Sequence, residues 1–204
     1  MRRFFILFSL IFCFFFFSCS KPGDLKINRA IKSYQTQNYE ESLKLLNEAL
    51  TEETNYSQDL IYNLIASIYL QQDDLENAVI YQEKIVEKNP EYRNLVSLGM
   101  TYHLLSRDSE SEATYKKAIA LKPEKGEAYA SLGALYLGQK DIPNAVENLK
   151  KASELEPKVA MIHANLAVAY SAAKNPEKAE EEFKIAEDLK CENLDEFKTR
   201  AENF

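Results

Sequence analysis

The sequence predicts an all-α protein built from stacked pairs of helices. Pro90, Pro123 and Pro157 follow one another at intervals of 33 and 34 residues, and a glycine–tyrosine pattern recurs with the same step. An interval near 34 residues is the length of one helix–turn–helix repeat. Only 5 glycines and 6 prolines occur in 204 residues, which excludes long flexible linkers.

The composition is typical of a folded protein that does not bind nucleic acid. Hydrophobic residues make up 46% of the chain and charged residues 28%. The formal net charge is −7, and no stripe of lysines and arginines crosses the sequence. The basic footprint of a nucleic-acid-binding protein is therefore absent.

The first residues form a segment of a different kind. Arg2 and Arg3 precede an apolar run at 4–17 that is rich in phenylalanine. A membrane-spanning helix needs about 20 apolar residues. The shorter run matches the apolar core of a secretory signal peptide, so we expect residues 1–18 to be a signal peptide.

A small residue precedes a cysteine at the end of this run, in Ser18-Cys19-Ser20, and this resembles the lipobox of bacterial lipoproteins. The resemblance implies that Cys19 carries the lipid, palmitate included, and becomes the new N-terminus. Phe16 and Phe17 stand where that family prefers Leu and a small residue, so an ordinary cleaved signal and an uncleaved anchor stay open. We expect residues 19–24 to form the lipidated tether, with Lys21-Pro22-Gly23-Asp24 interrupting regular structure.

Several series of residues recur along the rest of the chain. Leu98-Gly99-x-x-Tyr102 returns as Leu132-Gly133-x-x-Tyr136, and more loosely at Ala66 with Tyr69 and at Ala167 with Tyr170. Two further series are Ala78, Ser111, Ala145, Ala179 and Tyr115, Leu149, Phe183. Together they resemble the tetratricopeptide repeat. The resemblance implies a right-handed superhelix, or α-solenoid, of about five helix–turn–helix repeats with a C-terminal capping helix.

The series and the prolines divide the domain, expected at 25–204, into repeats. Four repeats are expected at 59–91, 92–125, 126–159 and 160–193, with a capping segment at 194–204. A degenerate repeat at about 23–58 has Ser33 in place of the tyrosine and Thr54 in place of the proline. The predicted helix pairs are 25–35 and 39–52, 59–71 and 74–88, 92–105 and 109–121, 126–138 and 142–155, and 160–172 and 176–189, followed by one helix at 193–203.

Residue size explains the series. Gly99, Gly133, Ala66 and Ala167 are small because the two helices of a pair cross closely there, opposite the Ala78 series. We expect the tyrosines, together with Tyr115, Leu149 and Phe183, to fill the wider gaps between successive repeats. Asp141 and Asn175 each precede a proline in the first helical turn, a pattern typical of a helix start.

No group of residues suggests catalysis. The chain lacks a Cys–His spacing for zinc, a glycine-rich phosphate loop and a nucleophile elbow. His163 occupies a packing column and His103 lies near the end of a first helix. The sequence therefore predicts a protein that is not an enzyme and has no metal or cofactor.

The family resemblance implies that the first helices line a groove for a partner. Helical spacing selects Leu60, Asn63, Ser67, Arg93, Val96, Met100, His103, Glu127, Ala130, Ala134, Leu137, Met161, Ala164, Val168 and Ser171. Most of these residues are small or apolar, and only Arg93 and Asn63 suit a carboxylate clamp. We expect the groove to hold a protein or peptide through an apolar or amphipathic segment. The alternative is an empty groove whose alanines only permit curvature.

These expectations combine into a function. The sequence predicts a membrane-anchored scaffold for protein–protein interaction in the bacterial cell envelope, such as an assembly or localisation factor, on the inner or the outer membrane. One alternative is a surface-exposed lipoprotein that engages host or external proteins. Another is an accessory subunit of an envelope enzyme.

Overall fold

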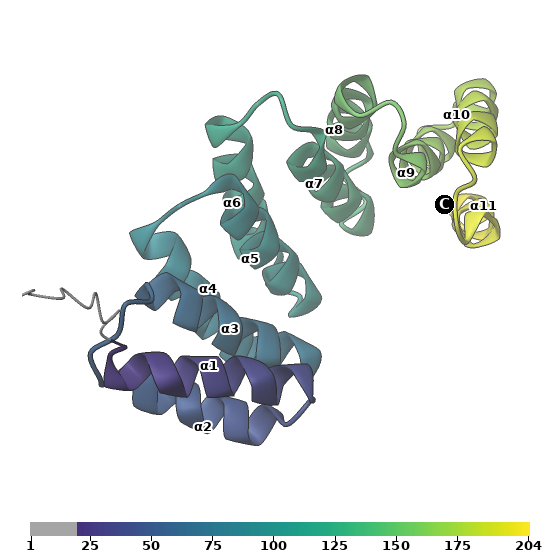
Figure 1. Ribbon diagram of the computed structural model, residues 1–204. Helices are drawn as coiled ribbons and strands as arrows, with labels where there is room; N and C mark the ends of the chain where they lie inside the picture. The colour runs from purple at the N-terminus through teal and green to yellow at the C-terminus, as the bar shows by residue number, and fades with distance from the viewer. Residues whose placement is uncertain (1–19) are drawn as a thin grey trace, which may run out of the picture. The chain divides into compact units, whose positions relative to one another are not determined.

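The computed structural model describes residues 20–204, which Figure 1 draws in colour. Within these residues it contains eleven α-helices and no strand. The chain divides into two compact units, one ending at Ile61 and one running from Tyr62 to Phe204, and the division falls inside α3 (Gln58–Gln71). The all-α prediction is confirmed.

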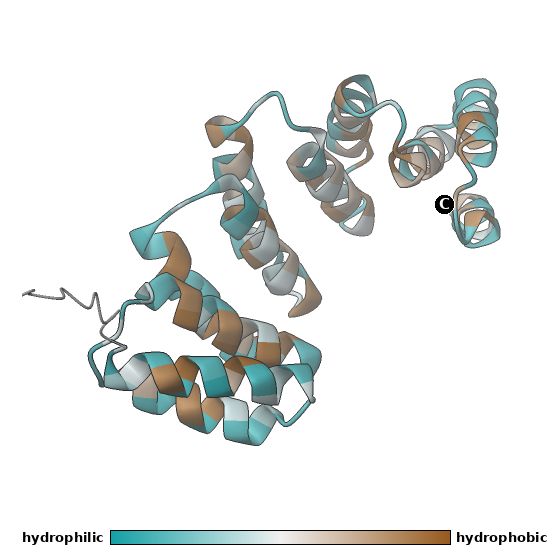
Figure 2. Ribbon diagram, in the orientation of Figure 1, coloured by the Kyte–Doolittle hydropathy of each residue, from teal (hydrophilic) through white to brown (hydrophobic). Residues whose placement is uncertain are grey.

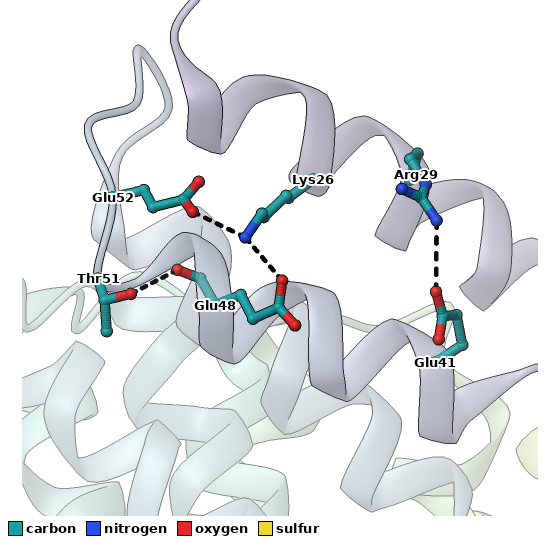
Figure 3. Close-up of polar contacts among 6 residues, drawn as sticks. All are labelled: Lys26, Arg29, Glu41, Glu48, Thr51 and Glu52. Carbon is teal, nitrogen blue, oxygen red and sulfur yellow. Dashed lines mark hydrogen bonds and ion pairs between the residues drawn. The ribbon is translucent and has the colours of Figure 1, made fainter.

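In the first unit α1 (Pro22–Gln35) packs against α2 (Tyr39–Ala49). Ile27, Ala30 and Leu46 are fully buried between the two helices. Figure 3 shows the polar edge of this contact, where Lys26 Nζ lies 2.6 Å from Glu48 Oε2 and 2.7 Å from Glu52 Oε1. These side chains are partly exposed, so we expect the ion pairs to orient the helices more than they stabilise them.

The start of α1 corrects the expected tether. The helix begins at Pro22, so Lys21-Pro22-Gly23-Asp24 opens a helix rather than interrupting one. A proline is tolerated in the first turn because its missing N–H would have no partner within the helix. The carboxylate of Asp24 accepts hydrogen bonds from the backbone N–H of Lys21 at 3.0 Å and of Asn55 at 2.7 Å.

The second unit is a stack of helix pairs. Its further helices are α4 (Leu75–Lys88), α5 (Tyr92–Leu104), α6 (Asp108–Leu121), α7 (Gly126–Gly138), α8 (Ile142–Leu155), α9 (Ala160–Ala172), α10 (Pro176–Asp188) and α11 (Leu194–Glu202). Within the pairs, α5 packs on α6, α7 on α8 and α9 on α10 (Figure 1). Successive pairs are joined by the contacts of α4 with α5, of α6 with α7 and of α8 with α9. Each helix carries both hydrophobic and hydrophilic residues (Figure 2).

The ends of the helices agree with the predicted signals. The side chains of Asp141 and Asn175 accept hydrogen bonds from the backbone N–H three residues later, at 3.4 and 3.3 Å. Pro90, Pro123 and Pro157 each stand two residues after the last residue of a second helix. The turns inside the pairs share one further feature, a non-glycine residue in the left-handed region at Gln37, Asp73, Ser106, Lys140 and Lys174.

The small-residue columns lie where the two helices of a pair are closest. Ser111 Oγ donates a hydrogen bond of 2.8 Å to the carbonyl of Gly99, and Ser42 Oγ makes the same bond to Ala30. A Cβ atom on Gly99 would lie 2.7 Å from the ring of Tyr115. Tyr115 therefore packs against its own repeat, and it also belongs to the core cluster that contains Leu132 and Tyr136 of the next repeat.

The tyrosine column does connect successive repeats. Tyr102 on α5 donates a hydrogen bond of 2.6 Å from its hydroxyl to Glu83 on α4, and Tyr136 on α7 donates one of 3.0 Å to Glu112 on α6. Burial and the bond to Glu83 raise the pKa of Tyr102 to about 12. The phenol therefore stays a donor across the physiological pH range.

The last helix packs mainly against α9 and less against α10. Phe197, Ala201 and Phe204 add to a hydrophobic cluster that contains Leu137, Leu149 and Val168. Because these partly buried side chains pack on the cluster, α11 and the residues after it cover the apolar end of the stack.

Candidate functional site

The predicted groove residues lie on the first helix of each pair. In the second unit α5 contacts α7 and α7 contacts α9, so the first helices form one continuous surface. We call it the first-helix face and define it by the predicted residues that are accessible there: Asn63, Ser67, Arg93, Met100, His103, Glu127, Ala130, Ala134, Met161 and Ser171. Leu60 belongs to the first unit and is 37% exposed.

Four predicted groove residues are buried and cannot contact a partner. Val96 is 4% exposed, Leu137 1%, and Ala164 and Val168 are fully buried. Val96, Leu137 and Val168 belong to the hydrophobic core cluster. Unlike α5 and α7, α9 also packs against α11, and Phe197 of α11 adds to the cluster that contains Val168.

The accessible apolar residues concentrate at two places on the first-helix face. Met100 is 49% exposed and Met161 60%. Leu104, which is not among the predicted groove residues, is 60% exposed and lies one helical turn after Met100. Its position four residues after Met100 is the sequence feature that could have identified Leu104 as part of the same face. Methionine and leucine side chains in this arrangement suit an adaptable apolar contact.

The two histidines have structural partners. His163 is 6% exposed; its Nδ1 lies 2.6 Å from Glu182 Oε2 and its Nε2 3.1 Å from the carbonyl of Pro157. His103 is exposed and lies 3.3 Å from Asp108 Oδ1. The contacts of His163 agree with the packing role that the sequence predicts.

Among residues 20–204, no group of three or more His, Cys, Asp or Glu side chains could hold a metal ion. None of the helices described is both long enough and apolar enough to span a bilayer. Cys191 is a free, partly buried cysteine whose thiol pKa is raised, mainly by burial. The proposed lipidation site, Cys19, and the signal peptide lie outside the described residues.

Models of the tetratricopeptide repeat match residues 60–92, 92–125 and 136–188, which together exceed half of the chain. The chain belongs to the tetratricopeptide-repeat family. Its helix pairs, closely packed small residues and inter-repeat tyrosines are those of an α-solenoid of this family, whose members serve as protein-interaction scaffolds. No curated protein matches the sequence.

Solved structures share this fold. The crystal structure of MamA superposes with a TM-score of 0.72 at 16% identity, covering 82% of this chain and 91% of that one. A MamA structure from Desulfovibrio magneticus RS-1 has a TM-score of 0.72 at 20% identity, covering 82% of this chain and 94% of that one. YrrB, described as a TPR protein with an unusual peptide-binding site, has a TM-score of 0.69 at 20% identity, covering 88% of this chain and 91% of that one. These identities establish a common fold only.

Proposed function

We propose that this protein is a scaffold that binds an apolar or amphipathic segment of another protein on its first-helix face. The observation that carries the proposal is the pair of exposed apolar side chains Met100 and Leu104 on α5. Such a pair, one helical turn apart, is what a helix-in-groove or extended-peptide ligand contacts. The likeness of the fold to YrrB supports peptide binding as a use of this architecture.

The surface around this pair favours an uncharged contact. The neighbouring first-helix positions on α7 are Ala130 and Ala134, both partly exposed, and α9 adds Met161. Arg93 and Glu127 place one charge of each sign near the beginning of α5 and α7. Because these charges are few and opposite, apolar burial provides most of the affinity in this proposal.

Photo-crosslinking in the cell that makes the protein tests this proposal. A photoreactive amino acid in place of Met100 should yield a crosslinked partner, and the additional change Leu104→Glu should abolish the product. The matched control is the same photoreactive residue in place of Ile80, which is 46% exposed but lies on the second helix α4. Equal crosslinking from positions 80 and 100, or no effect of Leu104→Glu, would contradict the proposal. The buried Val96 is unsuitable because a charge there would disturb the core.

We further propose that the scaffold is anchored in the bacterial envelope through a lipid on Cys19. The basis is the sequence alone, an apolar run at 4–17 followed by Ser18-Cys19. A palmitate label should enter the wild-type protein and the Cys191→Ser control, but not Cys19→Ser. Equal labelling of Cys19→Ser and wild type would refute the anchor.

A further inference from the structure

The last helix of the second unit does not continue the packing pattern of the helix pairs. Between pairs, a first helix packs mainly on the second helix of the pair before it, as α7 packs on α6 and α9 on α8. Helix α11 instead packs mainly on α9, which is a first helix, and less on α10, which is the second helix before it (Figure 1). Helix α11 is therefore placed as a helix laid on a first helix, and not as the beginning of a further repeat.

The positions that are closed on α9 are partly open on α7. Ala130 and Ala134 of α7 are partly exposed, whereas Ala164 and Val168, which stand one repeat later, are fully buried. Val168 belongs to the core cluster against which Phe197 of α11 packs. The part of the first-helix face on α9 thus differs from the part on α7 both in its exposure and in having α11 as a neighbour.

The sequence of α11 has the pattern of an amphipathic ligand. Leu194, Phe197, Ala201 and Phe204 follow one another at steps of three, four and three residues, a spacing that places them on one side of a helix. All four are partly buried, and the last three pack against the core cluster. The exposed residues of α11 are acidic or polar. A helix that binds in a groove presents an apolar stripe of this spacing.

The attachment of α11 to the unit is weak. The helix has 9 residues, and none of them is buried. No side chain caps its start, where Asn193 lies in the left-handed region with a φ of 58°. An element with few buried contacts opens at a lower free energy than the core does. We therefore expect α11 to detach while the helix pairs stay folded.

An open cleft of about 650 Å³ lies between α11 and α10. Its lining includes Phe183 of α10, Ala201 of α11 and Ser171 of α9. Ser171 belongs to the first-helix face, so α11 adjoins that face. The packing of α11 on α10 is incomplete, which agrees with its main contact being with α9.

We propose that α11 occupies the α9 end of the first-helix face as an internal ligand, and that the binding partner is an amphipathic helix that displaces it. The inference rests on the proposed function and narrows the partner to a helix with the apolar spacing of α11. Because α11 belongs to the same chain, its effective concentration at α9 is high, and the partner has to outcompete it. Release of α11 frees Ala164 and Val168 for the partner, next to the exposed Met161.

Two substitutions that loosen α11 test the displacement. Phe197→Glu with Phe204→Glu places charges on its apolar stripe, and Thr199→Glu with Asn203→Glu adds the same charge at exposed positions as the matched control. Random peptides displayed on phage are selected on the loosened full chain in detergent, with and without prior depletion on the wild type. We expect peptides that survive the depletion to share the apolar spacing of α11. They should bind the wild type and the control about tenfold more weakly than the loosened chain.

Hydrogen exchange of the wild type keeps the test independent of these substitutions. A selected peptide at saturating concentration should raise the exchange rate of the α11 amides about tenfold or more, because it takes the place of α11. The same peptide should lower the exchange rate of the α9 amides. A peptide that binds the wild type and leaves the exchange of α11 unchanged would overturn the inference.

The selection separates the inference from the proposed function. If peptides are enriched without depletion and none survives the depletion, α11 covers no binding site; the inference is then overturned, and the proposed function stands. If no peptide is enriched even without depletion, the proposed function is overturned, and the inference with it.

Discussion

Gly133 on α7 lies so close to Leu149 on α8 that a Cβ atom added to it would be 2.6 Å from Leu149 Cγ. Leu149 is fully buried and cannot move away without disturbing the core cluster. We expect Gly133→Ala to lower the free energy of unfolding by about 1–3 kcal/mol because it overpacks this contact. Urea unfolding, monitored by circular dichroism, measures this change in the free energy of unfolding.

The control for this change is on the same helix. Gly138 at the end of α7 has no atom within 4 Å of an added Cβ. Gly138→Ala should leave stability unchanged or raise it by up to about 1 kcal/mol, since alanine is the better helix former. Equal changes in the free energy of unfolding for the two substitutions would show that the close approach at Gly133 does not affect stability.

The turns inside the helix pairs offer a stabilising change. Lys140 follows α7 with a φ of 60°, a conformation that L-residues other than glycine adopt at a cost of about 1–2 kcal/mol. Glycine removes this cost but loses more backbone entropy on folding. We expect a net gain of about 0.5–1 kcal/mol for Lys140→Gly, visible as a higher midpoint of thermal unfolding. Lys140→Ala keeps the cost and should give no gain; a gain of equal size would contradict the explanation.

The buried amide of Gln82, which stands one repeat before Tyr115, leads to a prediction about stability. Gln82→Leu should raise the free energy of unfolding of the unliganded protein by about 1–2 kcal/mol, because it removes a buried polar atom without a partner. The reciprocal change Leu149→Gln places an amide in the same column of another repeat. It should lower the free energy of unfolding by more than about 2 kcal/mol. Denaturant unfolding of both variants checks the pair, and a loss of stability in Gln82→Leu would show that the amide is already satisfied.

The carboxylate of Asp24 makes the first unit sensitive to acid. Its pKa is lowered from 3.8 to about 2, first by the backbone N–H of Asn55 and then by the hydroxyl of Thr54. Because the folded pKa is the lower one, this stabilisation is present above pH 3.8 and is lost as the pH falls to about 2. The stability difference between wild type and Asp24→Asn should therefore be largest above pH 4 and shrink toward pH 2. A difference that stays constant over this range would contradict the assignment, and a carbon-13 NMR titration of the carboxyl reads its pKa directly.

The degenerate first repeat shows why the Asp24 contact was not predicted. Thr54 replaces the proline of the other repeats, and sequence comparison treats it as a loss of the pattern. In the structure Thr54 Oγ1 donates a hydrogen bond of 2.7 Å to Asp24 Oδ1. The two residues are 30 positions apart, and only the folded hairpin brings them together.

The amino-acid sequence alone determined the repeat length, the positions of the helices and the close packing of small residues. These properties follow from the capping residues at helix starts, from the prolines after helix ends and from an interval that repeats along the chain. Each of these signals depends on residues close together in the sequence, so it can be recognised without the tertiary structure. The tyrosine contacts to Glu83 and Glu112 could be expected for the same reason, since each repeat packs on the one before it.

Only the tertiary structure decided which of the predicted groove residues are exposed to solvent. Val96 and Met100 lie on the same helix and were selected together, yet Val96 is 4% exposed and Met100 49%. Val168, one repeat after the partly exposed Ala134, is fully buried, and its helix α9, unlike α7, also packs against α11. Helical periodicity fixes the direction of a side chain from its own axis, but burial depends on which neighbouring helix covers that direction.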